Sequence, residues 1–198
     1  LSILCLGGWH IGAVKDRDEA VKIMHTAIDE GVTFFDNCWD YHDGGSEEIM
    51  GKALAADQGR WRKKVFLMTK VCARDAKGAR AMIDESLKRL RTDVIDLMQI
   101  HMMAGLTQMM PAFERAKAAK RIRYVGISTS DDGQYDGLLQ AMRDGKFSLD
   151  LAIDLLKQLI LLFKVIGSLP DLNLQCFTLT IQFLRHRTED FGQSPDFI

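Results

Sequence analysis

The stretch Gly31-Val32-Thr33-Phe34-Phe35-Asp36 decides the fold of this chain. It is a short run of the β-branched and aromatic residues that strands favour, and it ends at a carboxylate. The residues before it form the apolar stripe of a helix, which Asp16 or Asp18 caps and which Gly31 ends. The stretch therefore predicts a helix that leads into a buried strand.

The same alternation recurs along residues 1–150. Strand-like runs lie at residues 3–6, 32–35, 65–69, 94–100 and 122–127. Their spacing of roughly 30 residues is typical of βαβ units, and amphipathic segments with helical periodicity separate them. A series of strands, each followed by a helix, predicts parallel strands that are covered on both faces or closed into a barrel.

The alternation fails after residue 150. Residues 151–166 read as one leucine-rich helix, although a sixth strand at residues 147–153 also fits, and residues 174–184 have a strand-like composition. A complete (β/α)8 barrel takes about 250 residues. We therefore expect an α/β fold, a TIM-type (β/α) barrel that is truncated or incomplete, with about five to six βα units in residues 1–150. Residues 151–198 are expected to form a divergent apolar C-terminal segment and a polar tail.

Composition excludes several classes of function. The chain has 198 residues and a formal net charge of -1, which gives no basic field for nucleic acid. Its longest apolar run, residues 159–163, is too short to cross a bilayer, and we expect no membrane partner. Cys5, Cys38, Cys72 and Cys176 are scattered without metal-ligand spacing, which favours a reduced cytoplasmic compartment and no metal site. The chain opens at Leu1 inside an apolar run, so we expect the native start to lie upstream.

Polar residues follow the predicted strands at the point where each strand ends. Asp36, Lys70, His101 and Ser128 end four successive strands, and Tyr41 follows shortly after the first of them. The carboxyl ends of parallel barrel strands meet at one rim, where the sites of such barrels are built. A phenol, a cation, a carboxylate and an imidazole are the groups needed to reduce a carbonyl by hydride transfer.

Each of these residues also has an ordinary interpretation. A lysine at a strand end is usually solvated, a lone histidine is usually structural, and an aspartate there can serve a turn. The nearby residues Trp39, Asp40, His42 and Asp43 match no ligand motif, and we interpret them as the loop around Tyr41. The pair Met102-Met103 is expected to line a pocket or to pack.

A longer set of motifs extends this pattern. In order along the chain they are Leu6-Gly7-Gly8-Trp9, Gly31 to Asp36 with Tyr41, Ser46-Glu47-Glu48, Gly51-Lys52-Ala53-Leu54, Val65 to Lys70, Glu85-Ser86-Leu87-Lys88-Arg89-Leu90, Thr92-Asp93-Val94-Ile95-Asp96-Leu97, Gln99-Ile100-His101 and Gly126-Ile127-Ser128. With these motifs the sequence resembles the aldo-keto reductase superfamily over roughly residues 1–145.

The resemblance implies a role for each rim residue. Tyr41 would donate a proton to the carbonyl oxygen, and Lys70, held by Asp36, would lower the pKa of that phenol. His101 would donate to the substrate oxygen or share in the proton relay. Trp9, Tyr41 and His101 would contact the substrate.

The resemblance also implies a cofactor. NADPH would be bound by Gly8, Trp9, Asp36, Ser128 and Thr129, although the family commonly has Asn where Thr129 stands. No segment after residue 150 resembles the part of the family that holds the adenosine phosphate.

Two functions remain open on the sequence. The first is an NAD(P)H-dependent reductase of aldehydes or ketones. Loss of the phosphate-binding region would impair its binding of the cofactor. The second is a catalytically silent barrel remnant that serves as a binding or assembly module. Because an incomplete barrel leaves open strand edges, we expect a homodimer or a larger homo-oligomer in either case.

Overall fold

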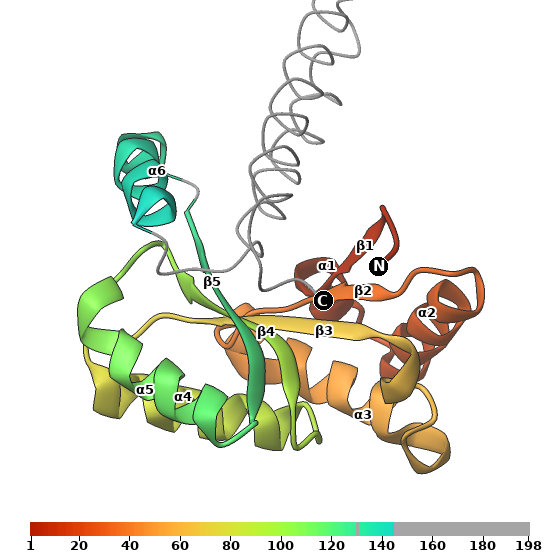
Figure 1. The fold of residues 1–198 in the computed structure, drawn as a ribbon. Helices are drawn as coiled ribbons and strands as arrows, with labels where there is room; N and C mark the ends of the chain where they lie inside the picture. The colour runs from red at the N-terminus through yellow and green to blue at the C-terminus, as the bar shows by residue number, and fades with distance from the viewer. Residues whose placement is uncertain (130, 145–198) are drawn as a thin grey trace, which may run out of the picture. The chain divides into compact units, whose positions relative to one another are not determined.

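The computed structural model describes residues 1–129 and 131–144. Its centre is a parallel sheet with the strand order β1-β2-β3-β4-β5, so each strand pairs with the next one in the sequence (Figure 1). The strands are β1 (Cys5–Gly7), β2 (Phe34–Asp36), β3 (Phe66–Val71), β4 (Ile95–His101) and β5 (Ile122–Ser128).

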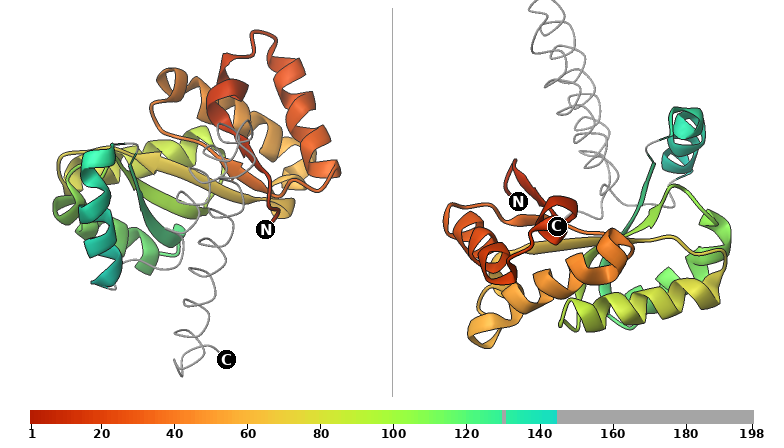
Figure 2. Two further views of the ribbon diagram at one scale, coloured as in Figure 1. Left: turned by 90° about the horizontal axis from the view of Figure 1, so that it is seen from above. Right: turned by 180° about the vertical axis from the view of Figure 1, so that it is seen from behind.

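A helix follows every strand. The helices are α1 (Gly8–Ala13), α2 (Arg17–Asp29), α3 (Gly45–Gly59), α4 (Ala76–Arg89), α5 (Leu106–Ala118) and α6 (Tyr135–Arg143). Short 3-10 segments are η1 (Tyr41–Gly44), η2 (Arg62–Lys64) and η3 (Asp132–Gln134). Helices α1, α2 and α3 gather beside one edge of the sheet and α4 and α5 beside the other (Figure 2).

Side-chain alternation along the strands separates the core from the site. Thr69 of β3 donates a hydrogen bond to Glu47 of α3, which shows that this side of β3 faces the helices. Because alternate residues of a strand point to opposite faces, Met68 and Lys70 face the other way, toward the barrel interior. Strands β2 to β5 are mostly buried, as expected for a parallel sheet that helices cover, whereas the edge strand β1 is partly exposed.

Local chemistry explains where two of the helices begin. Asp16 caps α2, because its carboxylate accepts hydrogen bonds from the backbone N–H groups of Asp18 and Glu19. Asp75 caps α4 in the same way through the N–H of Gly78. Of the two caps expected for the first long helix, the structure therefore uses Asp16.

Helices α3 and α4 approach each other at Gly51. A Cβ atom at this position would overlap the carbonyl oxygen of Arg89 and lie 2.8 Å from the backbone of Leu90. Only glycine lets the backbones of the two helices come this close.

The expected fold class is confirmed. The described residues form successive βα units of a TIM-type barrel, from β1 to the helix that follows β5. The sequence did not predict α1, because Gly8 and Gly12 lower the helix propensity of this short segment. The expectations for a sixth strand, an apolar helix and a polar tail fall outside the described residues, and the boundary at residue 150 stays a prediction.

No helix in the described part of the chain is both long and apolar enough to span a bilayer.

Candidate active site

Strands β2 and β3 bring a lysine and an aspartate together at their carboxyl ends. The Nζ atom of Lys70 lies 2.5 Å from Oδ1 of Asp36 and donates a second hydrogen bond of 2.8 Å to the carbonyl oxygen of Asn37. The two charged side chains are only 6% and 14% exposed. A buried pair of this kind is held in one geometry, because either charge alone would be costly to bury.

The third group at this position is the phenol of Tyr41. Its hydroxyl lies 3.4 Å from Nζ of Lys70, and the ammonium group lies 5.1 Å from the centre of its ring. Lys70 thus has Asp36, the carbonyl of Asn37 and the Tyr41 hydroxyl around one nitrogen, which matches the three donors of an ammonium group.

Burial decides the ionisation of Tyr41. Burial raises the pKa of the Tyr41 phenol, Lys70 lowers it and Asp36 raises it, and the net direction is upward. Lys70 lowers the pKa of this phenol, as expected, but it offsets only part of the effect of burial and is itself neutralised by Asp36, so the pKa lies above its usual value. The phenol is held in its protonated form.

The ammonium group of Lys70 is also held in its charged form. Burial on its own would lower the pKa of Lys70, but the Asp36 carboxylate outweighs this effect and raises the pKa. Lys70 is therefore held as a cation next to a neutral phenol.

An exposed tryptophan lies edge-on to Tyr41. The rings of Trp9 and Tyr41 are 5.3 Å apart at an angle of 81°. Trp9 is 52% exposed although it belongs to α1, so its ring offers an apolar surface beside the phenol. Gly8, which precedes it, packs directly against the end of β2, since a Cβ there would lie 2.8 Å from the carbonyl oxygen of Asp36.

His42 connects this tryptophan to the loop that carries Tyr41. Its Nε2 atom lies 2.7 Å from the carbonyl oxygen of Trp9, and its ring lies 4.6 Å from the Trp9 ring. The backbone is left-handed at His42 and Asp43, with φ values of 53° and 55°. From the sequence, His42 was expected only as part of the loop, and its position next to Tyr41 was the one signal that pointed to it.

The ends of β4 and β5 form a second group. His101 Nδ1 and Ser128 Oγ lie 2.9 Å apart, as their paired positions in the two strands require. Thr129 donates a hydrogen bond of 2.7 Å to Gln134 and accepts one of 3.0 Å from the N–H of Asp131. The site residues expected from the sequence thus fall into two groups on one rim: Asp36, Tyr41 and Lys70 with Trp9 and Gly8, and His101 with Ser128 and Thr129.

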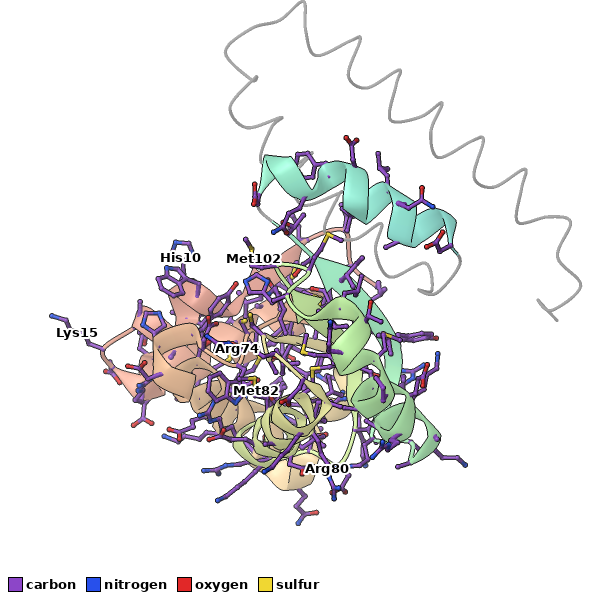
Figure 3. All side chains as sticks on the ribbon, turned by 90° about the vertical axis from the view of Figure 1, so that its left-hand side faces the viewer. His10, Lys15, Arg74, Arg80, Met82 and Met102 are labelled. Atoms are coloured by element: carbon purple, nitrogen blue, oxygen red, sulfur yellow. The ribbon has the colours of Figure 1, made fainter. Side chains whose placement is uncertain are left out.

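Figure 3 labels residues on both sides of the sheet. Met102, which follows His101, lies on the side that faces α6, whereas Arg80 lies on the side that α4 and α5 cover (Figure 3). Met102 and Met103 have left-handed backbone angles, with φ values of 55° and 52°, and the chain turns sharply there after β4.

Cysteine and possible metal ligands near the site can be assessed in the described residues. Cys38 is buried beside Lys70, and burial raises the pKa of its thiol. Within residues 1–129 and 131–144, no group of three or more His, Cys, Asp or Glu side chains is arranged to hold a metal ion.

Comparison with known proteins adds a family to this geometry. The sequence model of the aldo/keto reductase family matches residues 3–151. A methylglyoxal reductase of Escherichia coli is 33% identical over 139 residues, which cover 68% of this chain and 48% of that protein. An aldo-keto reductase of Bacillus subtilis is 35% identical over 148 residues, which cover 66% of this chain and 44% of that protein.

Solved structures give the same result. An aldo/keto reductase from Klebsiella pneumoniae in complex with NADP and acetate has a TM-score of 0.62 at 31% identity, over 71% of this chain and 50% of that one. A holo-form aldo-keto reductase from Bacillus halodurans has a TM-score of 0.61 at 29% identity, with the same coverage of 71% and 50%. This chain spans about half the length of the curated relatives it matches.

Proposed function

This chain belongs to the aldo/keto reductase family, and from this premise we propose that it is an oxidoreductase that reduces an aldehyde or ketone with NADPH. The observation that carries the proposal is the position of Lys70, whose one ammonium group contacts both the Asp36 carboxylate and the Tyr41 hydroxyl. This arrangement places the phenol beside a cation at the rim, and burial keeps the phenol protonated, which is the form that an acid catalyst must supply.

Tyr41 is the proton donor in this proposal. Its proton passes to the carbonyl oxygen and becomes the O–H of the alcohol product. The raised pKa of the Tyr41 phenol, which burial causes, keeps this proton available at neutral pH. Proton transfer from a positioned side chain contributes about 10²- to 10⁴-fold to a rate.

Lys70 stabilises the phenolate that remains after the transfer. A cation 3.4 Å from the phenol oxygen favours the negative charge that develops there. Asp36 keeps Lys70 charged and pointed at Tyr41. His101, oriented by Ser128, is proposed to donate a hydrogen bond to the substrate oxygen.

The residues at the rim fit a nicotinamide cofactor in their chemistry. Ser128 and Thr129 are buried hydroxyl residues at the end of β5, and their oxygen atoms can accept hydrogen bonds from a carboxamide. We propose that they bind the cofactor together with Gly8, Trp9 and Asp36. When bound, NADPH supplies the hydride that becomes the new C–H bond.

The substrate class follows from the apolar surface of Trp9 and from the relatives. We propose a small carbonyl compound that stacks on this exposed ring, in keeping with the methylglyoxal reductase that the chain resembles. We further propose that the protein acts in the cytoplasm and as a homodimer or larger homo-oligomer. A monodisperse monomer in sedimentation at micromolar concentration would contradict the proposed assembly.

A cofactor titration tests the proposed function. NADPH and NADH are added to the protein while quenching of its tryptophan fluorescence is followed, and carbonyl-dependent NADPH oxidation is then measured. We expect saturable micromolar binding and turnover that Tyr41→Phe lowers by about 10²- to 10⁴-fold. Tyr124→Phe is the matched control, because Tyr124 lies lower on β5 and stacks on Phe66. No binding up to millimolar cofactor would reject the reductase and favour the silent binding module.

A further inference from the structure

A buried carboxylate lies on the far side of β3 from the candidate active site. Glu47 of α3 is fully buried, and its Oε1 atom accepts a hydrogen bond of 2.7 Å from Thr69. Its Oε2 atom lies 3.6 Å from the guanidinium group of Arg89, which makes an ion pair but not a hydrogen bond. A buried carboxylate needs a cation nearby, and Arg89 supplies it.

Arg89 does more than neutralise Glu47. It is the last residue of α4, and its side chain is only 15% exposed. The guanidinium group donates to Glu85 at 2.8 Å and to the carbonyl oxygen of Trp39 at 2.9 Å, and it stacks on the Trp39 ring at 5.0 Å. One planar group thus contacts α3, α4 and the loop after β2, which the fixed fork of donors in arginine permits.

Arg89 contacts residues on both sides of Tyr41 in the sequence. Trp39, on one side, also donates its backbone N–H to the carbonyl oxygen of Lys70 at 2.9 Å and its indole N–H to Glu85 at 3.0 Å. Gly44, on the other side, has a φ of 88°, and a Cβ atom there would overlap the guanidinium carbon of Arg89. The guanidinium group is therefore packed against both ends of the loop that carries the phenol.

The loop between these ends has a conformation that needs support. His42 and Asp43 are left-handed, and Gly44 follows them with a positive φ. Residues other than glycine adopt such angles only where the surrounding structure holds them. Arg89 donates to the backbone carbonyl of Trp39 before this left-handed stretch and packs against Gly44 at its end.

We infer that Arg89 is a positioning residue, which acts through Trp39 and Gly44 to hold Tyr41 at hydrogen-bonding distance from Lys70. Glu47 and Glu85 in turn fix the guanidinium group. The inference rests on the proposed function for its catalytic meaning, but the loop geometry is a property of the protein without substrate.

The simpler alternative is that Arg89 only balances the charge of Glu47. The paired variant Arg89→Met with Glu47→Gln separates the two roles, because it removes both charges and leaves an amide oxygen at position 47 as an acceptor for Thr69. Arg89→Lys is the second variant, since it keeps a cation for Glu47 but lacks the fork that reaches Trp39. Arg89→Met alone is avoided because an unpaired buried carboxylate can prevent folding.

Three measurements are made on each variant. They are the free energy of unfolding by urea, the hydrogen exchange of the backbone amides of Trp39 and Tyr41, and kcat with KM for NADPH-dependent carbonyl reduction. Loss of one charge-assisted hydrogen bond is expected to speed exchange of the loop amides about tenfold or more. We expect the paired variant and Arg89→Lys to unfold near the wild-type urea concentration. We also expect kcat to fall about tenfold and KM to change less than about threefold, because misplacement of the proton donor affects chemistry more than binding.

Wild-type loop exchange in both variants would overturn the inference, and so would an unchanged kcat. Unfolding of the paired variant at much lower urea would also overturn it, because the role of Arg89 would then lie in the fold. If the wild-type protein shows no turnover, the proposed function fails and loop exchange alone decides the inference. The two failures can thus be told apart.

Discussion

Two carboxylates at opposite ends of the same sheet have very different partners. Asp96, near the start of β4, accepts hydrogen bonds of 2.7 Å from Arg62, 2.7 Å from Arg123 and 2.9 Å from the backbone N–H of Leu67. Asp36, at the end of β2, has Lys70 as its cation, and that cation also contacts Tyr41.

The difference separates stability from chemistry. Each of these three hydrogen bonds of Asp96 joins parts of the fold to one another, whereas the pair at the end of β2 points a donor at a phenol on the rim. In (β/α) barrels the carboxyl ends of the strands carry the chemistry and the amino ends carry stability. The predictions that follow test this division between the Asp96 cluster and the Asp36 pair.

The largest expected effect is on the rate at the Asp36 end. Tyr41→Phe removes the hydroxyl that Lys70 contacts, and we expect kcat for carbonyl reduction to fall by about 10²- to 10⁴-fold. The midpoint of urea unfolding is expected to change little, since the ring and its contact with Trp9 remain. Turnover equal to the wild type would show that another group donates the proton.

At the Asp96 end, the large effect is on stability. Asp96→Ala leaves two arginines without their carboxylate and the N–H of Leu67 without its acceptor, and we expect a loss of about 3–5 kcal/mol of unfolding free energy. Urea denaturation measures it. Asp29→Ala, at an exposed ion pair with Lys64, is the control and is expected to cost about 0–1 kcal/mol. A change in KM for the folded Asp96→Ala protein would argue against the division.

The pH dependence gives a smaller effect that is specific to the Asp36 end. Because burial raises the pKa of the Tyr41 phenol, the donor stays protonated past its usual pKa of about 10. The rate of reduction should therefore stay level through neutral pH and fall about tenfold per pH unit only above that value. A profile of kcat/KM against pH checks this, and a falling limb that begins near pH 7 would contradict it.

The same shifts affect stability in a defined direction. Tyr41 and Lys70 both have raised pKa values in the folded state. Their contribution to the free energy of unfolding is therefore complete below the usual pKa values of about 10. This contribution is lost as the pH rises through the pKa values of the folded state. Urea midpoints between about pH 7 and about pH 11 follow this loss.

The smallest effect distinguishes the two arginines of the Asp96 cluster. The Arg123 side chain is 55% exposed and that of Arg62 is 20% exposed. Arg62 also donates to the carbonyl oxygens of Val65 and Val94. We therefore expect Arg123→Ala to cost less than about 1 kcal/mol and less than Arg62→Ala, as measured by urea unfolding. Equal losses would show that exposure does not set the contribution of each arginine.

The strand ends were the most predictable part of the site. Asp36, Lys70, His101 and Ser128 follow apolar runs directly, and parallel pairing brings the ends of neighbouring strands to one edge. This reasoning needs only the period of the strands and their order. It does not place Tyr41, which lies in a loop and was identified through the family motifs.

The remaining features depend on packing between segments far apart in the sequence. The direction of the Tyr41 pKa shift depends on how deeply Trp9 and the loop bury the phenol, which the sequence does not state. The contact of Arg89 with Trp39 joins residues 50 positions apart. An arginine at the end of a predicted helix is ordinarily read as a favourable charge for the helix dipole, so its second role was not predicted.

The close approach of α3 and α4 at Gly51 has a consequence for protein engineering. Alanine is the smallest replacement for this glycine, and its methyl group already overlaps the backbone of α4 at Arg89. A library that randomises position 51 should therefore yield few functional clones. Those that survive should carry second-site changes that move α4 away from α3.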